Sequence, residues 1–97
     1  MKKETALTKA QEVLSEHPME WIIIAEELHK DGTPHLHCVV AFRTRVRWRN
    51  AENLLDPITG KHGNYQVAKN VHNVVKYVTK DGQYVADGLD VDAFLSA

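Results

Sequence analysis

Two histidines stand two positions apart in this sequence, at His35 and His37. Side chains at alternate positions of a β-strand point to the same face of the sheet, so the two imidazoles can bind one ion together. Glu26 and Glu27 end the preceding apolar segment, and a hairpin brings a carboxylate beside the histidine pair. Two imidazoles and one carboxylate leave coordination positions open, as a catalytic metal requires. The alternative interpretation is that both histidines are ordinary half-buried residues of a sheet.

A tyrosine with polar neighbours on its side of a predicted helix is the second group that can do chemistry. Its segment has one apolar face at helical spacing, made of Val71, Val74, Val75 and Val78. Tyr77 lies about 110° from the centre of that face, and it shares its side of the helix with Asn73, Lys80 and Asp81. A lysine one turn away can hold a phosphate oxygen or stabilise a phenolate, so the pattern favours a nucleophilic tyrosine. The alternative is an amphipathic tyrosine at the rim of a helix.

The elements that must position these side chains follow from hydrophobic periodicity and turn residues. We expect helices at residues 5–16, within 45–55, at 70–81 and from 90 onward, and strands at 21–25, 35–42, 64–68 and 84–85. The strand at 21–25 is apolar on both faces and should be central. Thr5 or Thr8 is the expected N-cap of the first helix, Gly82 should end the helix of Tyr77, and residues 30–34 and 56–60 are a turn and a loop. This order predicts one α+β domain over residues 1–97, with an antiparallel sheet and packed helices.

Composition excludes several classes of protein. The formal net charge is −1, which argues against binding of duplex DNA by bulk electrostatics. No apolar segment is long enough to span a membrane, and none follows the N-terminus as in a secretory signal. A single cysteine, Cys38, cannot form an internal disulfide.

Four arginines are concentrated in a window of nine residues. They alternate on one face of an extended segment, with Trp48 on the opposite face, and are Arg43, Arg45, Arg47 and Arg49. We interpret this window as a surface that grips a DNA backbone or stacks a base. The alternative is a solvated edge that deters strand pairing.

Together the motifs resemble the HUH endonuclease domain of replication-initiator (Rep) proteins from circular single-stranded DNA viruses, geminiviruses especially, and related plasmids. The metal motif of that family matches residues 27–37, which read ELHKDGTPHLH, and its tyrosine motif matches residues 77–82, which read YVTKDG. Residues 64–69 look like the segment that precedes the catalytic helix. The resemblance covers about residues 20–86 and implies a ferredoxin-like sheet.

The resemblance implies a ligand set for a divalent cation. His35 and His37 would bind Mn²⁺ or Mg²⁺, and Glu27 would be the acidic ligand. Glu26 is its rival, because the loop before the histidines varies in length within the family.

The resemblance also implies the chemistry. Tyr77 would attack single-stranded DNA, forming a 5′-phosphotyrosine and freeing a 3′-hydroxyl for a polymerase, while Lys80 positions the phosphate and Asp81 assists metal or lysine placement. The expected function is sequence-directed nicking and joining at a replication-origin stem-loop, which initiates rolling-circle replication. A replicative helicase domain or a host polymerase would be the partner, in the host nucleus for a eukaryotic virus and otherwise in the bacterial cytoplasm. The alternatives are a related transposase or relaxase, and a non-catalytic module that binds single-stranded DNA or self-associates.

One departure from the family concerns the start of the chain. Family members begin with a motif of the Phe-Leu-Thr-Tyr kind on a core strand before the first helix, whereas this sequence opens on Met1-Lys2-Lys3. We therefore expect a sheet that lacks its first core strand, in a truncated or internally started chain without the helicase ATPase. Because unpaired sheet edges are costly, we expect a marginal monomer, or a sheet completed by a partner segment such as one from another copy.

Overall fold

A computed structural model describes residues 2–28, 32, 34–43, 55, 57–58 and 69–96 of the chain. The elements are, in order, α1 (Lys3–Val13), β1 (Met19–Leu28), β2 (Pro34–Phe42), α3 (Val71–Thr79), β3 (Tyr84–Asp87) and α4 (Val91–Ser96). The predicted strand at 64–68, most of the helix within 45–55 and most of the loop at 56–60 lie outside the described residues. Every described strand follows α1. The prediction of an α+β fold with an antiparallel sheet is confirmed.

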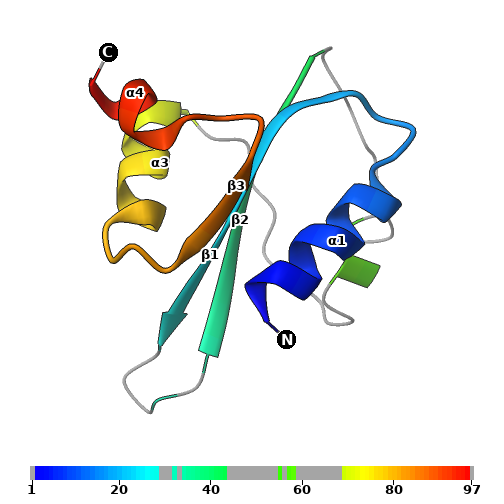
Figure 1. Cartoon of the computed structure of the whole chain (residues 1–97), viewed down its shortest axis with the longest axis horizontal. Helices are drawn as coiled ribbons and strands as arrows, with labels where there is room; N and C mark the ends of the chain where they lie inside the picture. Colours follow the sequence, from blue (N-terminus) through cyan, green and yellow to red (C-terminus); the bar gives the residue numbers. More distant parts are fainter. Residues whose placement is uncertain are drawn as a thin grey trace.

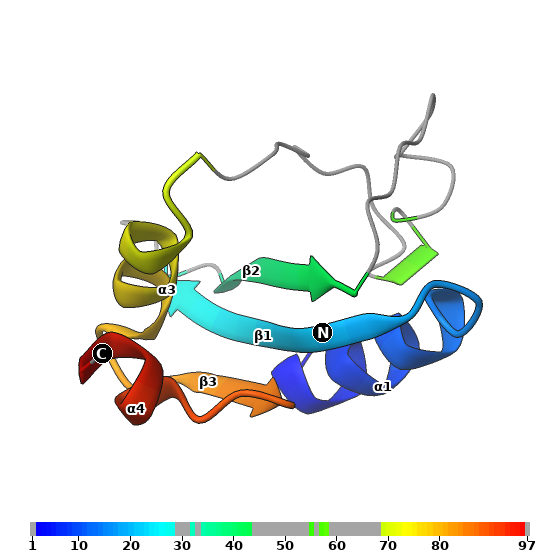
Figure 2. The same ribbon diagram turned by 90° about the horizontal axis from the view of Figure 1, so that it is seen from above.

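The described strands form one antiparallel sheet in the order β2-β1-β3 (Figure 2). β1 is central, as its apolar sequence predicts, because it pairs with β2 along one edge and with β3 along the other. Its residues 21–25 are all buried, with 7% exposure or less. A strand buried on both faces needs apolar side chains at successive positions, which is what this segment supplies.

Helices cover both faces of the sheet (Figure 1). On one face α1 contributes Ala6 and Ala10 to a core with Ile22 and Ile24 of β1. The other face carries α3 and α4, whose buried residues pack around Ile23. Alternate residues of β1 thus serve two separate cores, and the second core holds α3 close to the sheet.

The helix ends differ in how well the sequence predicts them. α3 begins where expected, since the Asn70 side chain accepts a hydrogen bond from the Asn73 backbone N–H at 3.0 Å. Gly82, with φ of 73°, ends the turn after this helix as predicted. The predicted threonine cap of α1 is wrong: the helix begins at Lys3, and the Thr8 hydroxyl donates to the Glu4 carbonyl within it at 3.3 Å.

Two further expectations need correction. Val71 is 41% exposed, so the valine face of α3 is buried mainly through Val75, which is fully buried. Pro57 and Ile58 are helical, although a loop was predicted there, and Ile58 belongs to the core beneath α1. None of the described helices has the length and hydropathy to cross a bilayer.

Candidate active site

The β1–β2 hairpin places the predicted metal ligands on one face of the sheet. Glu27 pairs directly with His35 across the two strands, and His37 pairs with Ala25, so the side chains of all three candidate ligands share the face that carries α3. The Glu27 carboxylate oxygen Oε2 lies 2.8 Å from Nε2 of His37. The rings of His35 and His37 are 4.6 Å apart between centroids, inclined at 75°. Both side chains of the Glu27–His37 pair are about one third exposed, so a ligand can reach them.

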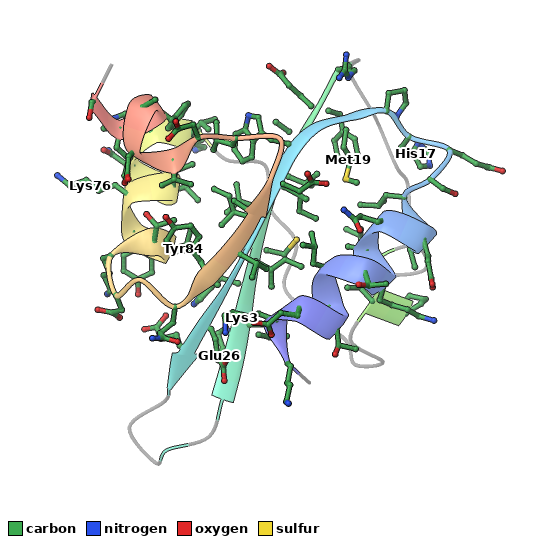
Figure 3. The ribbon with its side chains drawn as sticks, in the orientation of Figure 1. Lys3, His17, Met19, Glu26, Lys76 and Tyr84 are labelled. Atoms are coloured by element: carbon green, nitrogen blue, oxygen red, sulfur yellow. The ribbon has the colours of Figure 1, made fainter. Side chains whose placement is uncertain are left out.

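Glu26, the rival ligand, belongs to the opposite face. It pairs with Leu36 across the hairpin, and its Oε2 lies 3.8 Å from Nζ of Lys3 in α1. Figure 3 shows Lys3 and Glu26 side by side near the beginning of α1. Because successive residues of a strand alternate between faces, Glu26 cannot join the histidines without a change of register. The geometry therefore favours Glu27.

The oxygen and nitrogen donors of Glu27, His35 and His37 suit a divalent cation. Glu27 and His37 are well spaced to bind one together. Two ligand atoms about 2.1 Å from one ion, at right angles, lie about 3 Å apart, close to the 2.8 Å between Glu27 and His37. The predicted convergence of all three on a single point is not seen, since the described residues hold no ready cluster of three metal-ligating side chains. Binding an ion would replace the Glu27–His37 hydrogen bond with two bonds to the cation.

Tyr77 approaches this cluster from α3. Its ring centroid lies 6.2 Å from that of His37, with the planes at 87°. The core holds the helix in this position, because Val75 is fully buried and packs in one cluster with Trp21 and Ile23 of β1. The tyrosine itself is 51% exposed. Residues forty positions apart in sequence thus meet, with the phenol open to solvent.

The two polar residues after Tyr77 are placed differently. Nζ of Lys80 lies 4.1 Å from the centroid of the Tyr77 ring, a cation–π contact. Asp81 is exposed in the turn after α3, and within the described residues it makes no hydrogen bond or ion pair. Of the other two tyrosines in the sequence, Tyr84 packs against the core formed by β1, α3 and α4, and Tyr65 lies outside the described residues. Only Tyr77 among the described tyrosines combines exposure with a neighbouring lysine.

Of the arginine window only Arg43 is described; Arg45, Arg47, Trp48 and Arg49 lie outside the described residues. Arg43 follows β2, where its backbone N–H donates to the Pro18 carbonyl at 2.9 Å and its Nε to the Met19 carbonyl at 3.4 Å. Arg43 is six residues beyond His37, and six residues of extended chain span about 20 Å. Arg43 therefore lies at the other end of the sheet from the histidine pair.

Lys76 was not among the site residues predicted from the sequence. It is exposed on α3, and its position next to Tyr77 could have indicated it as a candidate.

Comparison with known proteins identifies the family. The protein-family model described as the geminivirus Rep catalytic domain matches residues 1–91 of this sequence. The chain is 42% identical over 79 residues to replication-associated protein A of Tobacco yellow dwarf virus (strain Australia), covering 77% of this chain and 25% of that protein. The replication-associated protein of the same virus is also 42% identical over 79 residues, covering 77% and 22%. That of Cabbage leaf curl virus (isolate Jamaica) is 36% identical over 72 residues, covering 70% and 21%. The chain thus matches a quarter or less of the length of these curated relatives, and it belongs to the geminivirus Rep catalytic domain family.

Proposed function

We propose that this chain is the part of a replication initiator that nicks and rejoins single-stranded DNA, with Tyr77 as the nucleophile. The observation that carries the proposal is the meeting of Tyr77 with the Glu27–His37 pair, 6.2 Å between the Tyr77 and His37 rings. A nucleophile must reach the atom it attacks while other groups bind the same phosphate. The exposed Tyr77 would supply the nucleophile, and a cation held by the adjacent imidazole–carboxylate pair would bind the phosphate.

In the nicking step the phenol oxygen of Tyr77 forms a bond to phosphorus, and the bond from phosphorus to the 3′-oxygen of the preceding nucleotide breaks. The phenol loses its proton to solvent, and the departing 3′-oxygen gains one. The product is a 5′-phosphotyrosine beside a free 3′-hydroxyl, which primes synthesis. Since one phosphodiester replaces another, the bond is conserved, and attack by a 3′-hydroxyl on the phosphotyrosine rejoins the strand.

His35, His37 and Glu27 would hold Mn²⁺ or Mg²⁺. A bound cation of this kind polarises the scissile phosphate and stabilises negative charge on the leaving oxygen. The 2.8 Å contact between Glu27 and His37 holds these two ligands side by side before a cation enters between them. Lys80, 4.1 Å from the Tyr77 ring centroid, supplies a positive charge that attracts the phosphate to the phenol. Asp81 would orient Lys80 or the cation once DNA is bound.

The proposed substrate is the stem-loop of a replication origin, and the proposed process is rolling-circle replication. A host polymerase would extend the 3′-hydroxyl that the nick creates, and a replicative helicase domain would unwind the duplex ahead of it. The proposed site of action is the nucleus of a eukaryotic host cell. The names of the relatives' viruses, called after tobacco and cabbage, support a eukaryotic host.

A covalent-trapping assay tests the proposal. The protein is incubated with a random-sequence single-stranded DNA pool labelled at its 3′ end, with and without Mn²⁺, and resolved under denaturing conditions. The label must be at the 3′ end because the tyrosine retains the 5′-phosphate of the downstream fragment. We expect a labelled protein band that requires Mn²⁺ and is absent from His37→Ala. Binding of the pool without any such band would favour the non-catalytic module instead.

A further inference from the structure

The exposed side of α3 presents more than the nucleophile. Asn73, Lys76, Tyr77 and Lys80 are all exposed, and at about 100° per residue they occupy a sector of about 100° on the helix surface. This sector faces away from Val75, the buried residue that anchors the helix. Figure 3 shows Lys76 extending from α3 away from the sheet.

Lys76 and Lys80 carry positive charge on this side of α3 and at its end, next to the exposed carboxylate of Asp81. The helix contains no acidic residue, and Lys76 and Lys80 stand four positions apart, where like charges repel. Within the described residues neither lysine makes an ion pair. The lysines of α1 behave differently, since Lys3 lies 3.2 Å from Glu4 and Lys9 lies 3.9 Å from Glu12. Asp81, the nearest carboxylate in sequence, forms no ion pair with Lys76 or Lys80 in the described part of the chain. In a chain of net charge −1, two adjacent unpaired cations beside an exposed tyrosine form a local site for an anion.

We propose that Lys76 binds the phosphate backbone of the single-stranded DNA that lies across Tyr77, and so acts as a DNA-positioning residue. This inference rests on the proposed function and adds a contact to it. Tyr77 stands between Lys76, one residue before it, and Lys80, one turn after it. Lys76 lies about 1.5 Å along the helix axis and about 100° around it from Tyr77, so a strand that brings one phosphate to the phenol and continues over the exposed side of α3 passes a second phosphate near Lys76. A lysine ammonium binds phosphate as a point charge without selecting a base, which suits positioning rather than sequence recognition.

A purely structural role for Lys76 makes a different prediction. Lys76 lies in the last turn of α3, where a cation stabilises the helix through its dipole. Loss of that effect changes the melting temperature but leaves the salt dependence of DNA binding unchanged. A phosphate contact changes the salt dependence, because each neutralised phosphate releases counterions.

The experiment measures the affinity of the chain for fluorescein-labelled oligo(dT) of twenty nucleotides by anisotropy, from 50 to 200 mM NaCl. All variants carry Tyr77→Phe, so that binding is measured without covalent chemistry. For Lys76→Ala we expect the slope of log K against log salt to fall by about 0.7, with a loss of affinity of about 8-fold at 50 mM and about 3-fold at 200 mM. Lys76→Arg should retain the parent slope, and Lys76→Glu should bind more weakly than Lys76→Ala. The control is Lys9→Ala, an exposed lysine of α1 paired with Glu12, which should bind like the parent.

An unchanged slope in Lys76→Ala overturns the inference, as does an equal loss in Lys9→Ala, which would indicate a general effect of charge. Failure of the parent to bind oligo(dT) overturns it as well. The readout does not depend on nicking. Salt-dependent binding through Lys76 together with an absent covalent adduct would contradict the proposed chemistry and leave the DNA contact standing.

Discussion

Replacing Gly88 with alanine tests how tightly the chain packs between β3 and α4. Gly88 has a φ of 84°, in the left-handed region that costs a residue with a side chain about 1–2 kcal/mol. An added Cβ would lie 2.6 Å from the backbone oxygen of Glu20 and 3.3 Å from Cα of Trp21. Both atoms belong to the backbone of the central strand, which cannot move aside like the end of a flexible side chain. Overpacking of this kind adds about 1–3 kcal/mol.

The two costs together come to about 2–5 kcal/mol, out of a total stability on the order of 5–15 kcal/mol for a domain of this size. At about 4–8 °C per kcal/mol, the melting temperature should fall by at least about 8 °C. Gly82→Ala is the matched control, because Gly82 has a similar φ of 73° with no atom within 4 Å of the added Cβ. It should lose only the backbone component, about 1–2 kcal/mol.

Thermal unfolding followed by circular dichroism compares the two variants with the parent chain. The difference between Gly88→Ala and Gly82→Ala isolates the contact with the Glu20 carbonyl. Equal losses of stability in the two variants would refute the close approach of the β3–α4 turn to β1.

Two other predictions follow from the hairpin. Glu27→Gln should abolish or strongly reduce Mn²⁺-dependent adduct formation, because it removes the carboxylate beside His37, whereas Glu26→Gln, on the face that contacts Lys3, should retain it; the reverse result would show that the hairpin register is wrong. Desolvation by surrounding protein atoms raises the pKa of the Cys38 thiol from 9.0 to about 11, although the side chain retains solvent contact. At pH 8 the thiolate should therefore be about 100-fold scarcer than in an unfolded chain, and alkylation by iodoacetamide correspondingly slower, unless the thiol is more open than the structure indicates. Because the folded pKa is raised, the contribution of this thiol to folding stability is present below about pH 9 and is lost as the pH rises through about 11.

Local patterns predicted the elements that carry the candidate site. The consecutive apolar residues of β1 required burial on both faces, and that placed the strand at the centre of the sheet. Gly82 ends the turn after the helix of Tyr77 as expected, and the helix predicted from residue 70 begins there with the Asn70 side chain as its cap. The threonine cap of α1 failed because the helix begins at Lys3, before either threonine, without a side-chain cap.

The choice between Glu26 and Glu27 could not be made from sequence. It depends on the register of the hairpin, and a shift of one residue exchanges the two faces. The same is true of the meeting of His37 and Tyr77, which requires α3 to dock on the sheet through Val75. The constraint on Gly88 depends on a contact with Glu20, far away in the chain, and no local pattern indicates it.

The central claim is that Tyr77 is the residue that becomes joined to DNA. The most direct measurement is peptide mapping by mass spectrometry of the covalent product formed with single-stranded DNA and Mn²⁺. The nucleotide should be attached through its 5′-phosphate to the peptide that contains Tyr77. Tyr77→Phe should yield no covalent product while retaining the melting temperature of the parent chain. Attachment at Tyr65 or Tyr84, or a product that persists in Tyr77→Phe, would contradict the assignment.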